Sequence, residues 1–100
     1  MYSFDYAPRF LRCVKRCKQQ GKDLTLLWEA VQQLIEDGSV PDSYSPHMLH
    51  EEFAGYHECH LEEDWLLIWK QNDNKLTLVL YDTGTHAELF KKRYKLVKKK

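Results

Sequence analysis

The spacing of apolar residues changes near the middle of this chain, and the change limits the fold to a helical part followed by a strand part. From Phe10 to Gly38, apolar residues recur at the period of about 3.6 that is typical of a helix with one buried face. After a stretch rich in Ser, Pro, Asp and Gly from Ser39 to Pro46, the period becomes two, as in strands. A chain of 100 residues has material for one hydrophobic core. We therefore expect a single domain over residues 1–100.

The first part of the chain predicts a short strand and two helices. Residues 1–6 alternate apolar and polar side chains before Pro8, which fits a strand. An amphipathic helix follows and ends at Gly21, and a second helix runs from the N-cap Asp23 to Gly38. Because the connection between them is so short, the two helices must form an antiparallel hairpin.

The second part predicts three consecutive strands, over Phe53–His60, Asp64–Gln71 and Lys75–Tyr81. Asn72-Asp73-Asn74 supplies turn residues, so the last two strands form a hairpin. The run Trp65–Trp69 lacks alternation, which indicates a central strand covered on both faces. The predicted fold class is α+β, with a small antiparallel sheet packed against the N-terminal two-helix hairpin in the order β-α-α-β-β-β.

Composition excludes disordered and membrane-spanning chains. Hydrophobic residues make up 43% and charged residues 30%, which is typical of globular proteins. The longest apolar stretch, Trp65–Trp69, is far shorter than the roughly 18 residues that indicate a membrane span. The N-terminus also lacks the pattern of a secretory signal, so we expect a cytoplasmic protein with no membrane partner. Three cysteines cannot all pair within one chain, and we expect reduced thiols.

The charges are sorted into blocks although the net charge is zero. Residues 9–22 hold six Lys or Arg and no acid, residues 51–64 hold six Asp or Glu and no base, and residues 91–100 hold seven basic residues. Zero net charge argues against a general nucleic-acid coat protein. The sorting nevertheless lets two basic segments approach a polyanion, with three ordinary solvated faces as the alternative.

The histidines lie outside the predicted helical hairpin, and they are the side chains best suited to proton transfer near neutral pH. Strand alternation places Glu58 and His60 on one face of their strand and His57 and Cys59 on the other. Glu58 and His60, with Asp64 just beyond, form the set suited to acid–base chemistry. An exposed polar sheet face is the alternative. The five histidines are His47, His50, His57, His60 and His86.

A zinc site built from these histidines and Cys59 is not supported. The sequence contains no Cys-x-x-Cys pair, and structural zinc sites usually come as two short ligand pairs. His57 and Cys59 also point away from His60. We therefore predict neither a metal nor a cofactor.

Thr85 and Glu88 have the spacing of a capping box, which makes His86 the first residue of a helix. The free amides at such a helix start suit a phosphate. The positive helix end disfavours an imidazolium, and this favours His86 as an acid toward a leaving oxygen. An ordinary surface histidine is the alternative. After Phe90, the basic residues 91–100 either extend a helix or form a flexible arm.

Three segments together resemble the YafQ branch of the RelE/ParE toxin superfamily: Gly55-Tyr56, His60–Lys70 and Thr83–Phe90. The combination of His-x3-Asp-Trp with Thr-Gly-Thr-His carries this resemblance. It implies a small bacterial toxin that is held inactive by an antitoxin and cuts messenger RNA in the ribosomal A site. It further implies a RelE-like fold, a metal-independent endoribonuclease reaction, and a toxin–antitoxin complex that is a higher oligomer.

The resemblance also implies the residues of the site. It implies a catalytic set of His47, Glu58, His60, Asp64 and His86, with Trp65, Lys70 and Phe90 at the substrate. The implied reaction is attack of the 2′ hydroxyl on the neighbouring phosphorus, with His86 as the acid and Asp64, His60 or His47 as the base. Glu58 departs from the family pattern, in which an aspartate is usual, and the extra methylene changes its reach.

Phosphate stabilisation must come from few cations. No arginine occurs between Arg16 and Arg93, so histidines, Lys70 and backbone amides are expected to carry it. The basic helix at residues 9–22 and the C-terminal lysines are then expected to dock ribosomal RNA.

Two other functions remain open at this point. A gyrase-binding toxin of ParE type needs no catalytic histidines, so His47, His60 and His86 count against it. A non-catalytic RNA-binding or ribosome-associated module would use the basic blocks and not the histidines.

Overall fold

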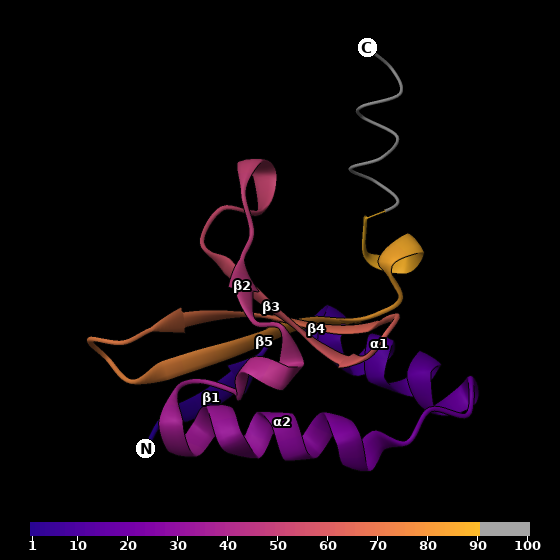
Figure 1. Ribbon diagram of the computed structural model, residues 1–100, viewed down its shortest axis with the longest axis horizontal. Helices are drawn as coiled ribbons and strands as arrows, with labels where there is room; N and C mark the ends of the chain where they lie inside the picture. Colours follow the sequence, from indigo (N-terminus) through magenta and orange to yellow (C-terminus); the bar gives the residue numbers. More distant parts are fainter. Residues whose placement is uncertain (91–100) are drawn as a thin grey trace.

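A computed structural model of the chain describes residues 1–90, in which one five-stranded sheet carries two helices on one of its faces (Figure 1). The strand order across the sheet is β1-β5-β4-β3-β2. The elements in chain order are β1 (Ser3–Tyr6), α1 (Pro8–Gln19), α2 (Leu24–Asp37), the short 3-10 helix η1 (Asp42–Tyr44), β2 (His47–Met48), the 3-10 helix η2 (Glu51–Phe53), β3 (Tyr56–Glu62), β4 (Trp65–Asn72) and β5 (Thr77–Gly84).

Both predicted helices form, and their ends have local causes. α1 starts on Pro8, whose missing amide proton costs nothing in a first turn. α2 starts after Asp23, whose side chain accepts a hydrogen bond from the Thr25 amide at 3.0 Å. It ends at Gly38, where the backbone is left-handed and an added Cβ would lie 2.5 Å from the Tyr2 ring. The turn at Gly21 reverses the chain, so that both helices cover the same face of the sheet.

β4 is the central strand, and its position confirms the prediction made for the run Trp65–Trp69. It pairs with β3 on one side and β5 on the other, both antiparallel. Trp65, Leu67 and Trp69 pack in the core between the sheet and the helices, whereas Leu66 and Ile68 pack on the opposite face. A strand covered on both faces needs apolar residues at every position, which explains the missing alternation.

Three features of the sheet differ from the prediction. The edge pair of β1 and β5 is parallel, so the sheet is mixed and not purely antiparallel. No hairpin joins these two strands, and their relative direction is therefore set by the whole path of the chain from α1 to β4. The segment before β3 also contains β2, which is too short to show a period. β5 runs on to Gly84, beyond the predicted end at Tyr81, where a bulge opposite Ile68 and Trp69 interrupts the alternation.

The remaining predictions concern cysteines, membranes and the C-terminus. All three cysteines, Cys13, Cys17 and Cys59, are free and buried. Among residues 1–90, no helix is long and apolar enough to cross a membrane. The predicted basic extension at residues 91–100 lies outside the residues that the structure describes.

Candidate active site

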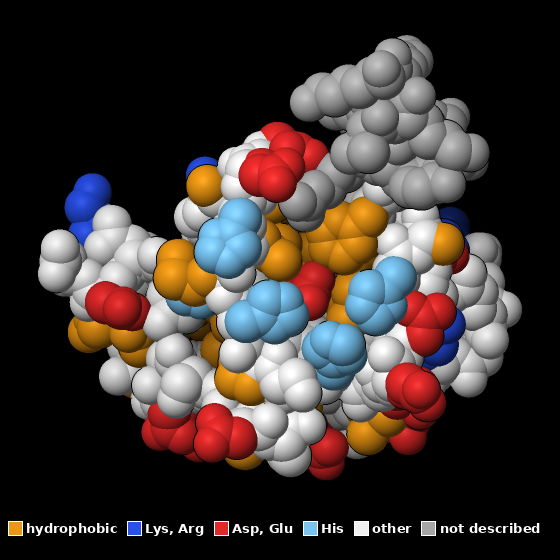
Figure 2. Space-filling model, turned by 45° about the horizontal axis from the view of Figure 1, so that its top comes forward, with side chains coloured by type: hydrophobic (Ala, Val, Ile, Leu, Met, Phe, Trp, Pro, Cys, Tyr) orange, Lys and Arg blue, Asp and Glu red, His pale blue; other side chains and the backbone are white. Residues whose placement is uncertain are grey.

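Two segments project from the sheet on the face opposite the helices, which we call the open sheet face (Figure 1). One is β2 with η2, and the other is the helical turn of residues 86–90. Phe53 and Phe90 connect them, with ring centroids 5.6 Å apart. Figure 2 shows histidine side chains gathered around hydrophobic and acidic side chains on one face of the molecule. The apolar floor between the two projections consists of Leu49, Leu66, Ile68 and Leu89, with Phe53, Tyr56, Tyr81 and Phe90 packed against it.

Glu58 is a buried carboxylate between two histidines. Only 3% of the residue is exposed. Its Oε1 lies 3.0 Å from His47 Nε2 and 3.9 Å from His60 Nε2. β2 places His47 directly opposite Glu58, and His60 follows on the same face of β3. The carboxylate is within contact distance of the His47 ring and faces the His60 ring at a longer distance, so it lies between the two imidazoles. Glu58 is therefore placed to act as a positioning residue.

Asp64 and His86 form a second pair at the other side of the pocket. Asp64 Oδ1 accepts a hydrogen bond from the backbone amide of His86 at 2.9 Å and lies 2.6 Å from His86 Nδ1. The predicted capping box forms, since the Thr85 amide donates to Glu88 Oε1 at 2.9 Å and the Glu88 amide donates to Thr85 Oγ1 at 3.2 Å. Since Asp64 engages Nδ1, the other ring nitrogen, Nε2, is left for exchange of a proton with a substrate.

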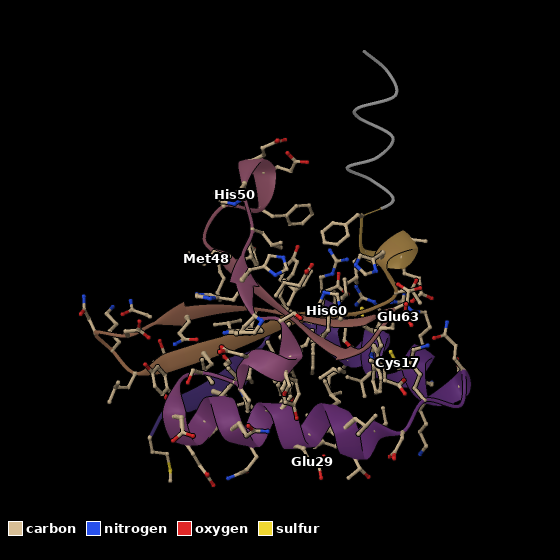
Figure 3. The ribbon with its side chains drawn as sticks, in the orientation of Figure 1. Cys17, Glu29, Met48, His50, His60 and Glu63 are labelled. Atoms are coloured by element: carbon tan, nitrogen blue, oxygen red, sulfur yellow. The ribbon has the colours of Figure 1, made fainter. Side chains whose placement is uncertain are left out.

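Glu58 with its two histidines and the Asp64–His86 pair belong to one pocket. The ring centroids of His60 and His86 are 5.6 Å apart, although the two residues come from β3 and from the turn after β5. In Figure 3, His60 lies on β3 below the projection that carries His50. The structure thus brings together all five residues of the predicted catalytic set: His47, Glu58, His60, Asp64 and His86.

The Asp64 carboxylate has a lowered pKa, chiefly because the His86 amide donates to it and then because the His86 side chain does. We predict that His86→Ala moves the pKa of Asp64 part of the way back to its ordinary value, since the amide still donates. Carbon-13 NMR titration of the carboxyl measures this, and an unchanged midpoint would contradict the arrangement.

Because the folded pKa of Asp64 is depressed, the stabilisation by Asp64 is present above the unfolded pKa and is lost as pH falls through the folded pKa. The stability difference between wild type and Asp64→Asn should therefore shrink in acid.

The three predicted substrate residues do not share one environment. Phe90 lies beside the pocket, with its ring centroid 6.4 Å from that of His86. Lys70 is exposed on the open sheet face, where its Nζ lies 4.9 Å from the Tyr56 ring centroid. The expectation that Trp65 contacts substrate is wrong, since it is 1% exposed and packs among the residues under the helices. Its Nε1 donates to Thr83 Oγ1 at 2.9 Å.

The histidines outside the set lie elsewhere. His57 is on the helix side of β3, as alternation predicts, and its ring stacks on Trp69 with centroids 5.4 Å apart. His50 is exposed at the start of η2. Among residues 1–90, no group of three or more His, Cys, Asp or Glu is arranged to hold a metal ion.

Sequence reasoning missed the position of Arg9. It assigned this residue to a basic helix face, but the guanidinium reaches the open sheet face, where Nη1 donates to the Tyr81 hydroxyl at 3.2 Å. Arg9 Nη2 also lies 2.8 Å from the buried Asp82 carboxylate. Arg16 likewise turns inward and donates to the Thr83 carbonyl at 3.1 Å. A helical period shows which side of a helix a residue occupies, and not how far a long side chain reaches around the sheet.

Comparison with known proteins agrees with this fold. Residues 2–91 match the family model described as a bacterial toxin of type II toxin-antitoxin systems, YafQ. The mRNA interferase toxin YafQ of Escherichia coli strain B / BL21-DE3 is 36% identical over 87 residues, which are 86% of this chain and 92% of that protein. The crystal structure of YafQ from E. coli BL21(DE3) has a TM-score of 0.83 at 33% identity and covers 90% of this chain and 99% of its own. YafQ in the E. coli DinJ-YafQ complex has a TM-score of 0.81 at 34% identity, with coverage of 90% and 99%. The chain therefore belongs to the YafQ family of bacterial toxins of type II toxin-antitoxin systems.

Proposed function

We propose that this toxin cleaves messenger RNA in the ribosomal A site by attack of a ribose 2′ hydroxyl on the neighbouring phosphorus. The protein is an mRNA interferase, the activity for which its E. coli relatives are named. The observation that supports the mechanism is the meeting of the Asp64–His86 pair with His60 on one face of the sheet. Imidazoles and carboxylates at this spacing can supply and remove protons on opposite sides of one phosphate, without a metal ion.

His86 is assigned as the general acid. As the 2′ oxygen bonds to phosphorus, the bond to the 5′ oxygen breaks, and this leaving oxygen needs a proton. Asp64 Oδ1 lies 2.6 Å from His86 Nδ1 and fixes the orientation of the ring, and Nε2 on the other side gives its proton to the 5′ oxygen. The products are a 2′,3′-cyclic phosphate and a free 5′ hydroxyl.

His60 is assigned as the general base that removes the proton of the 2′ hydroxyl. Asp64 is already engaged by the amide and the ring of His86, which makes it the weaker candidate. The His60 ring lies 5.6 Å from that of His86, and one phosphate between the two rings can meet an acid and a base at once. Glu58 holds His47 at the rim of the pocket through a 3.0 Å contact, and its carboxylate faces His60 Nε2 at 3.9 Å.

We predict that Glu58→Gln slows cleavage by about tenfold to a hundredfold, because the buried group that faces both imidazoles loses its charge. Glu58→Asp keeps the charge and shortens the reach, so its rate should lie between those of Gln and wild type. Single-turnover cleavage on programmed ribosomes measures the rates, and Glu62→Gln at the exposed end of β3 is the matched control. A full rate in Glu58→Gln would remove Glu58 from the mechanism.

The partners follow from family membership. We propose that a cognate antitoxin holds the toxin inactive in a complex that is a higher oligomer, as an antitoxin accompanies YafQ in the E. coli DinJ-YafQ structure. Three of the exposed cations on α1, Arg12, Lys15 and Lys18, are proposed to dock ribosomal RNA. Binding should then weaken as salt rises.

The experiment that tests this function is induction of the toxin in a bacterium, followed by mapping of messenger RNA 5′ ends. Codon-phased ends that disappear with His86→Gln support the nuclease. DNA damage linked to gyrase would instead support the ParE-type alternative, and growth inhibition that survives the substitution would support a non-catalytic module.

A further inference from the structure

Two tyrosines adjoin the catalytic pocket on the open sheet face. Tyr56 precedes Glu58 on the same face of β3, two residues or about 7 Å along the strand. Tyr81 lies across the sheet on β5, and the ring centroids of the two tyrosines are 4.8 Å apart with a tilt of 55°. Both side chains are half-buried in the floor of the face. Their rings therefore form a fixed surface directly beside the residues assigned to catalysis.

Two cations reach these rings from different elements. Arg9 of α1 places its Cζ 4.9 Å from the Tyr81 ring centroid, and Lys70 of β4 places its Nζ 4.9 Å from that of Tyr56. Both cationic residues are exposed. A guanidinium, an ammonium and two phenol hydroxyls are all hydrogen-bond donors, and donors gathered in this way suit a phosphate. Burial raises the pKa of Tyr56, so its hydroxyl keeps its proton.

The charge at this cluster is only partly compensated. The Asp82 carboxylate, 3% exposed, lies 2.8 Å from Arg9 Nη2 and holds the guanidinium across Tyr81. Arg9 Nη1 donates to the Tyr81 hydroxyl. Lys70 has no ion pair with any of residues 1–90, and the cluster thus keeps a cation available to an anionic ligand.

A hollow continues the face beyond Lys70. It has a volume of about 290 Å³ and is lined by Gly55, Lys70, Asn72, Thr77 and Val79 among others. Asn72 brings an amide and Val79 an exposed apolar surface, which together suit the edge and the face of a nucleobase. Along the open sheet face, the catalytic pocket is therefore followed by the tyrosine pair, then by Lys70 and then by the hollow.

We propose that Arg9, Tyr56, Lys70 and Tyr81 form a second phosphate subsite, which holds the backbone phosphate next to the scissile one while the hollow beyond Lys70 takes the attached base. This inference rests on the proposed function, because the subsite binds a further stretch of the RNA strand that is cleaved. Arg9 then contributes to phosphate stabilisation. From the sequence alone this role is expected of the histidines and Lys70, because no arginine occurs between Arg16 and Arg93.

The test combines protein variants with RNA in which one phosphate is made neutral. Ribosomes are programmed with messenger RNA that carries a methylphosphonate at either phosphate flanking the scissile one, and cleavage is measured as a function of toxin concentration. The variants are Lys70→Gln and Tyr81→Phe, with Lys75→Gln, an exposed lysine in the β4–β5 turn, as the matched control. For wild type and control, we expect one of the two neutral phosphates to raise the half-saturating toxin concentration about tenfold, with kcat little changed.

In Lys70→Gln and Tyr81→Phe, the same neutral phosphate should raise the half-saturating toxin concentration little further, because the contact between the subsite and this phosphate is already lost. The subsite would be overturned if the effects of the protein substitution and of the neutral phosphate multiplied at both flanking phosphates. It would also be overturned if neither the substitution nor the neutral phosphate changed the half-saturating toxin concentration, even with His86-dependent cleavage intact. Failure of wild type to cleave the unmodified message in a His86-dependent way would overturn the proposed function itself. Thermal melting of each variant shows whether it is folded.

Discussion

Replacing His86 by glutamine is expected to slow cleavage of ribosome-bound messenger RNA by about a hundredfold to ten-thousandfold, the usual contribution of a positioned acid or base. The substitution removes the proton donor but leaves the backbone amide that donates to Asp64. The local fold should therefore persist, and the loss should appear in kcat. Single-turnover cleavage of a defined message, together with a circular dichroism melt, measures both quantities.

A change of leaving group tests the role assigned to His86. When sulfur replaces the 5′ oxygen, the leaving group departs without protonation, and the rate of His86→Gln should return close to that of wild type. His60→Gln should stay slow on the same RNA, since His60 is assigned as the base. His57→Gln is the matched control, because His57 stacks on Trp69 on the other side of the sheet. A His86→Gln rate that sulfur does not restore would show that His86 is not the acid.

Replacing Trp65 by alanine is expected to lower the free energy of unfolding by about 3–5 kcal/mol, the usual cost of emptying a large core position. Trp65 is 1% exposed and packs under the helices. Trp65→Phe keeps the larger part of that packing, so its cost should be smaller, and about 1 kcal/mol of it comes from the lost hydrogen bond from Nε1 to Thr83. Urea denaturation of the two variants measures both differences.

Cleavage by the folded fraction of Trp65→Phe should equal that of wild type. A tenfold loss of rate at unchanged stability would instead place Trp65 at the RNA. Trp28→Phe is the control, because Trp28 is 43% exposed on α2 and its replacement should cost little in stability or rate.

The helices and the central strand could be predicted because their signals are local. Asp23 and Gly38 mark the ends of α2 through their own backbone and side-chain chemistry. The run Trp65–Trp69 identifies a strand covered on both faces before its neighbours are known. The capping box of Thr85 and Glu88 likewise acts within four residues, and it fixes the start of the turn that carries His86.

The catalytic set came from a resemblance to the YafQ family, and local patterns alone left it open. Alternation separates Glu58 and His60 from His57 and Cys59, and that separation is confirmed by the stacking of His57 on Trp69. The period could not predict that His47 lies opposite Glu58, because β2 has only two residues. Nor could it predict that Asp64 binds the amide of a residue 22 positions later.

Trp65 and Arg9 show what only the tertiary structure decided. The face to which Trp65 points depends on the register between β3 and β4, which a bulge between His60 and Glu62 shifts. The reach of Arg9 to Tyr81 depends on how α1 crosses β5, 72 residues later in the chain. The sequence by itself determined the two helices and their ends, the three long strands and the two sides of β3, because these follow from backbone and side-chain preferences within a few residues. The register between β3 and β4, the crossing of α1 over β5 and the reach of the Arg9 side chain follow from packing between distant segments, which leaves no periodic pattern in the sequence.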